Sequence, residues 1–139
     1  MKDIKELLLH REPFLFVDKL VSCDNQSAVG EYTFTEEKNP FFKGHFPGNP
    51  IVPGVILVES MAQVCAAAVV AGGQAGDHVP VFILAGVEDV RFLRPVRPGD
   101  TLVTHAANGK SRGRFHSFDV EGFVNNERVV KARLKCFTE

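Results

Sequence analysis

The chain has 139 residues, which is the length of one domain spanning residues 1–139. Sixteen Lys and Arg residues against seventeen Asp and Glu residues give a formal net charge of -1, so no overall basic field attracts nucleic acid or anionic lipid. The three cysteines lie far apart without a C-x-x-C pair, and the N-terminus lacks the apolar segment of a secretory signal. We therefore expect a cytoplasmic protein that binds no nucleic acid and does not insert into a membrane.

The first 54 residues predict a short helix, a hairpin and a stiff loop. Asp3 to Leu9 has helical spacing with Asp3 as N-cap, and two strands follow at Phe14 to Val21 and Ala28 to Phe34, with a turn over residues 23–27. From Gly44 to Gly54, six of eleven residues are Gly or Pro. This composition excludes regular helix and indicates an extended, rigid approach to the next element.

The longest apolar segment, Val55 to Ala71, contains only Glu59, Ser60 and Gln63 as polar residues and ends at Gly72-Gly73. As a helix it would be about 25 Å long, too short and too acidic to span a bilayer comfortably. A helix that is apolar on almost every face must be covered by protein on almost every face. We therefore predict that this helix forms the core of the domain.

The rest of the chain alternates in the manner of strands. The predicted strands are Val79 to Val87, Asp89 to Val96, Thr101 to Ala107, Arg114 to Val124 and Arg128 to Phe137, with turns at residues 97–100, 108–109 and 125–126. Consecutive strands and one apolar helix predict an α+β single domain, in which an antiparallel sheet curls around the helix. Exposed edge strands would then favour a homodimer.

One histidine, one glutamate and one glycine form the candidate site. Glu59 lies inside an apolar helix, where an unpaired carboxylate is costly unless it is neutral or well bonded, so it is a candidate acid. His45 lies in the rigid loop and is a candidate base. The N–H of Gly54, at the start of the helix, is placed to bind an oxyanion.

The segment from Gly44 to Gln63 (GHFPGNPIVPGVILVESMAQ) resembles the signature of the FabZ-type 3-hydroxyacyl-[acyl-carrier-protein] dehydratases of type II fatty acid biosynthesis. The resemblance extends to residues 9–18, 91–100 and 110–113, and so over nearly the whole chain. It implies a hot-dog fold, in which a sheet wraps around a central helix. Glutamate at position 59 resembles this group, whereas the sister FabA-type dehydratase-isomerases have aspartate; one sequence leaves open whether the protein also isomerises trans-2 to cis-3 enoyl chains.

The family resemblance also implies roles for individual residues. His45 and Glu59 match the catalytic pair, and Gly54, with Val55 beside it, matches the site that binds the thioester carbonyl. The implied reaction converts a (3R)-3-hydroxyacyl thioester, carried on the phosphopantetheine of acyl carrier protein, into the trans-2-enoyl thioester without metal or cofactor. The family further implies a homodimer in which His45 of one protomer faces Glu59 of the other, and it allows a trimer of dimers.

Further residues are candidates for the acyl tunnel and for carrier docking. Leu9 stands where the FabZ-type family commonly has a proline, and Phe82 and Ile83 stand where the family usually has tyrosines. These departures bear on the preferred acyl chain length and on gating of the acyl tunnel. The tunnel candidates are Phe46, Phe92 and Ile83, and the candidates for docking acyl carrier protein are Lys110, Arg112, Arg114 and Arg91. The remaining histidines, at positions 10, 78, 105 and 116, are interpreted as surface or packing residues, and Cys65 as a core residue. A hot-dog thioesterase and a non-catalytic acyl-thioester-binding module stay as alternatives.

Overall fold

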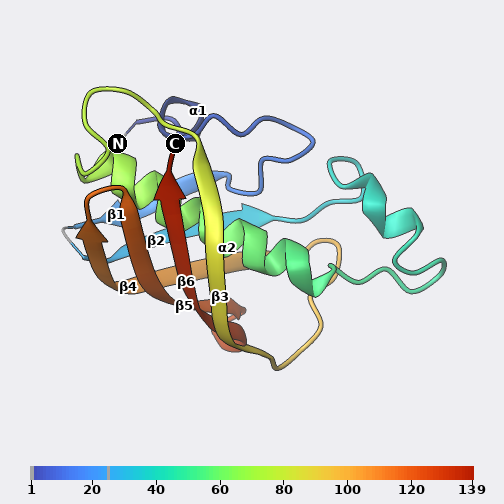
Figure 1. Ribbon diagram of the computed structural model, residues 1–139. Coiled ribbons are helices and arrows are strands. Elements are labelled where there is room, and N and C mark those ends of the chain that lie inside the picture. Colours follow the sequence, from blue (N-terminus) through green and yellow to red (C-terminus); the bar gives the residue numbers. More distant parts are fainter. Residues whose placement is uncertain (1, 25) are drawn as a thin grey trace.

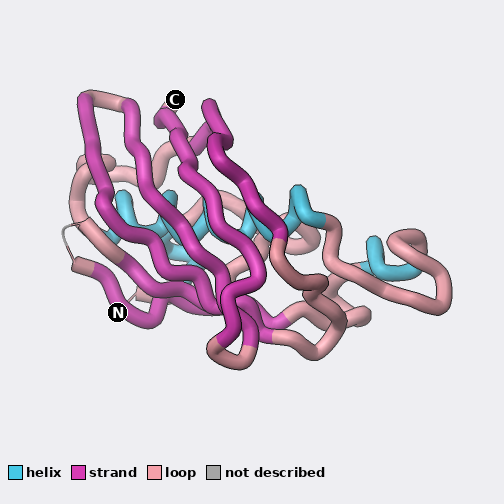
Figure 2. Tube along the Cα trace, turned by 90° about the horizontal axis from the view of Figure 1, so that it is seen from below, coloured by secondary structure: helices cyan, strands magenta, loops and turns pink. Residues whose placement is uncertain are grey.

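The computed structural model of the protein describes residues 2–24 and 26–139. Six strands form one antiparallel sheet in the order β1-β2-β4-β5-β6-β3, and the long helix α2 lies along its concave face (Figures 1 and 2). The elements in chain order are α1 (Ile4–Leu7), β1 (Lys19–Cys23), β2 (Ala28–Thr33), the 3-10 helix η1 (Pro40–Lys43), α2 (Gly54–Ala71), β3 (Phe82–Phe92), β4 (Thr101–Arg112), β5 (Phe115–Val124) and β6 (Glu127–Thr138). This arrangement confirms the predicted α+β class and the hot-dog fold.

Helix α2 forms the centre of the core, as its apolar sequence predicts, and packs against all six strands. It approaches the sheet so closely that a Cβ at Gly30 of β2 would lie 2.7 Å from the Val64 side chain. By length and composition alone α2 could cross a membrane, but 61% of it is buried inside the protein. The burial accounts for its apolar composition without a bilayer.

The predicted strand from Phe14 to Val21 is wrong in its first half, because β1 begins only at Lys19. Residues 14–16 instead pair with polar side chains of α2. The Gln63 side chain accepts from Phe16 N at 2.7 Å and donates to Phe14 O at 2.9 Å, and Ser60 Oγ donates to Phe16 O at 2.7 Å. Two of the three polar residues in α2 thus bind backbone groups that a strand would have paired with a neighbouring strand.

Near the N-terminus, Asp3 caps α1 as predicted, with a reciprocal bond from its own N–H to the Glu6 side chain, but the helix ends at Leu7 and not at Leu9. The turn predicted over residues 23–27 joins β1 to β2, with Asn25 outside the described residues.

Two other predicted boundaries are also wrong. The strands predicted at Val79 to Val87 and Asp89 to Val96 are one strand, β3, whose register against β6 shifts twice and in which Asp89 has a φ of 53°. The turn predicted at Asn108-Gly109 is a bulge inside β4, which continues to Arg112. A residue with positive φ favours a bulge as well as a turn, so local sequence does not separate the two. The turn at Asn125-Asn126 is confirmed, with φ values of 50° and 64°.

Candidate active site

The loop between η1 and α2 holds the imidazole of His45 through the backbone. His45 Nδ1 lies 2.8 Å from Ile51 O, and Ile51 N donates to His45 O at 2.8 Å. Because a carbonyl oxygen can only accept, Nδ1 carries the hydrogen, and in the neutral ring Nε2 has a free lone pair. His45 is therefore set up to accept a proton at Nε2.

The same loop is fixed to the turn that follows β3. Arg97 Nη1 donates to Asn49 Oδ1 at 2.7 Å, and Val52 N donates to Val96 O at 2.8 Å. The Phe46 ring stacks on the imidazole, with 4.2 Å between ring centroids and an interplanar angle of 24°. The base is thus held by contacts on several sides, which limits the positions that its ring can take.

His45 lines a largely apolar cavity of about 520 Å³, which we call the His45 cavity. Gly54 and Val55 also line it, and as the first two residues of α2 they present backbone N–H groups that have no partner within the helix. The Phe92 ring forms another wall, and a Cβ at Gly54 would lie 2.8 Å from it. Glycine at this position therefore leaves room for the ring and for a ligand oxygen near the helix start.

Glu59 lines a different and much smaller cavity, of about 30 Å³, which we call the Glu59 cavity. Its Oε2 accepts from Gln63 Nε2 at 2.9 Å and lies 3.6 Å from Nε2 of His10. The carboxyl group is therefore paired, as its position in an apolar helix requires. The lining residues are His10, Glu59, Ala62, Gln63, Ala66, Phe82, Leu84 and Cys136.

The two predicted catalytic side chains do not meet within one chain. His45 and Glu59 line separate cavities that share no residue. Gly54 and Val55, by contrast, share the His45 cavity as expected. A protein that uses both groups on one substrate must bring the two cavities together.

The tunnel candidates are divided in the same way. Phe92 lines the His45 cavity, and Phe46 stacks on His45 while half exposed. Ile83 is exposed and lines neither cavity, whereas its neighbours Phe82 and Leu84 line the Glu59 cavity. Successive side chains of a strand point to opposite faces, which explains why the neighbours and not Ile83 reach this cavity.

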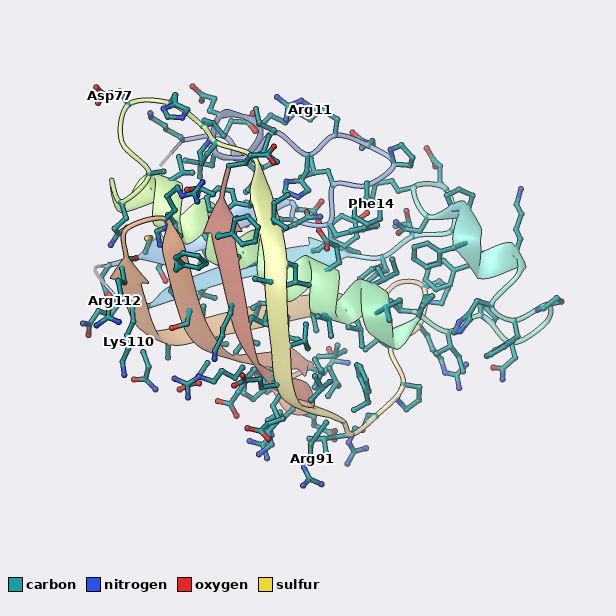
Figure 3. All side chains as sticks on the ribbon, viewed as in Figure 1. Arg11, Phe14, Asp77, Arg91, Lys110 and Arg112 are labelled. Carbon is teal, nitrogen blue, oxygen red and sulfur yellow. The ribbon has the colours of Figure 1, made fainter. Side chains whose placement is uncertain are left out.

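The docking candidates lie at two ends of the sheet. Figure 3 shows Lys110 and Arg112 at one end and Arg91 at the other. Arg114 lies beside Arg112, in the turn between β4 and β5. Among the described residues, neither Lys110 nor Arg112 forms an ion pair. Within a single chain, the four residues therefore do not form one continuous surface.

Sequence reasoning missed His10 and Gln63, which both face Glu59. The signal that could have found His10 is its place in the segment 9–18, one of those that carry the family resemblance.

Cys65 is a core residue as predicted, and burial raises the pKa of its thiol well above the ordinary value. Burial likewise raises the pKa of Cys136 to about 11, so both thiols stay protonated at neutral pH. Within residues 2–24 and 26–139, no group of three or more His, Cys, Asp or Glu side chains is arranged to hold a metal ion.

The fold is that of the hot-dog proteins, and this protein holds a histidine in one cavity and a glutamate in another. A FabA-like domain model matches residues 8–133, and the chain belongs to this family. It is 48% identical over 132 residues to the 3-hydroxyacyl-[acyl-carrier-protein] dehydratase FabZ of Thermomicrobium roseum, covering 94% of this chain and 87% of that protein. It is 41% identical over 133 residues to the protein of the same name from Clostridioides difficile, covering 95% of this chain and 92% of the relative.

Solved structures share the fold at low sequence identity. The dehydratase heterocomplex ApeI:P from Xenorhabdus doucetiae matches with a TM-score of 0.88 at 18% identity, over 100% of this chain and 92% of that one. The PaaI protein of the phenylacetic acid degradation operon of E. coli matches with a TM-score of 0.63 at 23% identity, over 86% of this chain and 81% of that one. At these identities the likeness shows the hot-dog fold alone.

Proposed function

We propose that the protein is a cytoplasmic 3-hydroxyacyl-[acyl-carrier-protein] dehydratase of type II fatty acid biosynthesis. It removes water from a (3R)-3-hydroxyacyl thioester to give the trans-2-enoyl thioester. The proposal rests on the His45 imidazole, which lines a cavity beside the start of α2 and whose Nδ1–H is bound to a carbonyl, so that Nε2 is left as the proton acceptor. The membership in the FabA-like family and the names of the relatives agree with this reaction.

The first step is proton removal next to the thioester carbonyl. Nε2 of His45 takes a proton from C2, and the electron pair of that C–H bond moves toward the carbonyl oxygen. The N–H of Gly54, with Val55 beside it, holds the developing negative charge on that oxygen. Such a donor is typically worth about 3–4 kcal/mol in the transition state.

The second step is loss of the hydroxyl group. As the enolate electrons return to form the C2–C3 double bond, the C3–O bond breaks and the oxygen takes a proton from Glu59, directly or through water, and leaves as water. The proton gained by His45 then returns to Glu59 through solvent. The histidine thus acts as general base and the carboxyl group as general acid.

A second copy of the chain completes the site. β3 is an edge strand whose Phe92 end lines the His45 cavity, while Phe82 and Leu84 at its other end line the Glu59 cavity. Antiparallel pairing of two β3 strands about a two-fold axis would bring the His45 cavity of each protomer to the Glu59 cavity of its partner. Exposed apolar side chains along and beside the strand support this interface; they are Val81, Ile83, Leu84, Val87 and Phe92.

The shared site can be tested by mixing two inactive variants. His45→Ala and Glu59→Ala should each lose at least about a hundredfold in turnover, the low end for a general acid or base. When equal amounts are unfolded and refolded together, about half of the dimers should be mixed, and each mixed dimer has one site with both lesions and one with none. Activity should therefore recover to about a quarter of wild type. Mixed dimers proven by mass, with no recovery, would contradict the shared site.

The reaction itself can be tested with a soluble 3-hydroxybutyryl thioester. A dehydratase produces an enoyl thioester that absorbs in the ultraviolet, a thioesterase releases free thiol, and a binding module does neither. We expect ultraviolet absorbance without thiol. Thiol release alone would favour the thioesterase alternative.

We propose acyl carrier protein, an acidic protein, as the partner that delivers the substrate. The β3 pairing would bring Arg91 of one protomer to the end of the other protomer where Lys110, Arg112 and Arg114 lie. The four candidates, separated within a chain, would then surround one region of the dimer. Such a basic surface would speed association at low ionic strength.

A further inference from the structure

We propose that His10 is a positioning residue for Glu59: its Nε2–H and the Gln63 amide both face Oε2, which leaves Oε1 as the oxygen that exchanges the proton with the leaving hydroxyl. The inference rests on the proposed dehydration and adds a residue to it. His10 lies before β1 and Glu59 in α2, so only the folded chain brings the two side chains together.

The orientation of His10 follows from its two ring nitrogens. Nδ1 is buried and has no hydrogen-bond partner among the described residues, whereas Nε2 lies 3.6 Å from Glu59 Oε2. A buried N–H without a partner is costlier than a bare lone pair, so the hydrogen of the neutral ring belongs on Nε2. Burial lowers the pKa of His10; the Glu59 carboxylate opposes this effect and Arg11 adds to it. The ring is therefore neutral at pH 7 and presents one donor, which faces Glu59.

The backbone around His10 is held in place by Arg11, which is labelled in Figure 3. The Arg11 guanidinium donates to Leu8 O at 2.8 Å, His10 O at 2.7 Å and Lys5 O at 3.0 Å. These three bonds tie residues 5–10 into one turn. The imidazole is thus presented to Glu59 from a fixed base and not from a free loop.

Gln63 supplies the second donor, and its orientation is also determined. Its Oε1 accepts from Phe16 N, which leaves its amide nitrogen to donate to Phe14 O and to Glu59 Oε2. Two donors, Gln63 and His10, therefore converge on the same carboxyl oxygen. A carboxyl oxygen that faces two donors cannot also carry the acidic hydrogen without a clash of hydrogens, so the transferable proton is on Oε1.

The imidazole of His10 and the carboxyl group of Glu59 are close but not directly hydrogen-bonded. A separation of 3.6 Å is longer than a direct hydrogen bond, and the Glu59 cavity has room for a water molecule. His10 therefore acts on Oε2 by a small approach or through one bridging water. The remaining walls are apolar side chains and Cys136, whose raised pKa keeps its thiol neutral. Arg11, Glu59 and Cys136 are thus the charged or titratable side chains that bear on His10.

The test compares two substitutions of His10. His10→Gln keeps an N–H donor at about the distance of Nε2, whereas His10→Leu has similar bulk and no donor. A misplacement of about 1 Å can cost up to about a hundredfold in rate, so we expect His10→Leu to lose about tenfold to a hundredfold in kcat with KM changed by less than about twofold. His10→Gln should keep kcat within about threefold of wild type. Wild-type kcat in folded His10→Leu, or equal losses in both variants, would overturn the proposal.

A second measurement does not depend on activity. The ¹⁵N spectrum of the histidine-labelled protein at pH 7, with the His10 signals assigned from His10→Gln, should show a neutral ring protonated at Nε2. A ring protonated at Nδ1, or a charged ring, would overturn the proposal even if His10→Leu did not fold. If the wild-type protein has this tautomer but does not dehydrate the hydroxybutyryl thioester, the proposed function fails while the geometry of His10 stands.

Discussion

The His45 and Glu59 regions hold their reactive groups in opposite ways. His45 is fixed by a backbone carbonyl at the rim of an open cavity of about 520 Å³, whereas Glu59 is fixed by side chains around a much smaller cavity of about 30 Å³. An open apolar cavity admits an acyl chain and a proton acceptor can face it directly. The smaller cavity brings the polar side chains of His10, Glu59 and Gln63 together, which suits a group that protonates a leaving hydroxyl.

One chain thus builds two half-sites that do not meet. β3 connects the two half-sites, because its Phe92 end forms a wall of the His45 cavity and its Phe82 end forms a wall of the Glu59 cavity. The exposed edge of β3 is therefore the surface on which the proposed activity depends. A substitution that separates the two edges should therefore disable both sites of the dimer at once.

Outside the catalytic pair, the largest effect is expected from a charge on the β3 edge. Val87, in the middle of β3, is 42% exposed, so Val87→Lys should not disturb the folded chain, but it would place like charges close together across the two-fold axis. We expect a monomer by analytical ultracentrifugation with dehydration reduced at least about a hundredfold. The matched control is Val21→Lys, on the opposite edge strand β1, where Val21 is 48% exposed. A dimer with full activity in Val87→Lys would show that the half-sites join elsewhere.

A smaller loss is expected from Gly54→Ala in the His45 cavity. Alanine keeps the backbone N–H, but its Cβ would lie 2.8 Å from the Phe92 ring, so this wall of the His45 cavity must shift. We expect about a tenfold loss in kcat/KM, the order of one misplaced group in a preorganised site. Without the Phe92 ring the same substitution should cost less: the double variant Gly54→Ala, Phe92→Ala should lose less kcat/KM relative to Phe92→Ala than Gly54→Ala loses relative to wild type. An equal loss in both backgrounds would mean that the added methyl group itself blocks the thioester.

Charge reversal at the docking candidates should affect the partner and not the chemistry. Lys110→Glu with Arg112→Glu should raise KM for carrier-linked substrate several-fold, with a larger effect at low salt, because basic side chains attract an acidic partner over about a Debye length. The short soluble thioester should react at the wild-type rate. Lys19→Glu, on β1 at the opposite edge of the sheet, is the control. Equal losses on both substrates would indicate a folding defect and contradict the docking role.

The smallest effect is expected on stability in mild acid. Burial lowers the pKa of His116, which lies beside Phe82 of the Glu59 cavity with its Nδ1 2.7 Å from Ser111 Oγ, and burial also lowers the pKa of His10. As pH falls through about 6.5, the unfolded chain binds protons at these histidines before the folded chain does, so the free energy of unfolding decreases. The decrease continues down to the lowered pKa values of the folded state.

Urea unfolding at pH 7.5 and pH 5.5 measures this decrease. His116→Gln should make the urea midpoint less sensitive to pH than in wild type. His78→Gln, at an exposed position between α2 and β3, should leave the sensitivity unchanged. An unchanged sensitivity in His116→Gln would show that protonation of His116 is not linked to unfolding.

Several features could be predicted from local sequence because local forces produce them. The apolar composition of residues 55–71 requires a buried helix, and Gly72-Gly73 ends it close to the predicted residue. The Gly and Pro residues of the loop before α2 exclude regular structure and leave His45 in a constrained segment. The asparagine pair at 125–126 adopts the positive φ values that a tight turn between strands needs. In each case the residues that determine the structure are neighbours in the chain.

The sequence by itself therefore determined the class of fold, the identity of the candidate base, acid and oxyanion donor, and the family. Only the tertiary structure decided that His45 and Glu59 line different cavities, that β3 is one strand reaching both, and that Gln63 and His10 converge on the same carboxyl oxygen. The physical reason is the range of the contacts. Gln63 bonds to residues 14 and 16, which lie 47 to 49 positions away, and such pairings are selected by the packing of the whole sheet around α2 and not by local propensity.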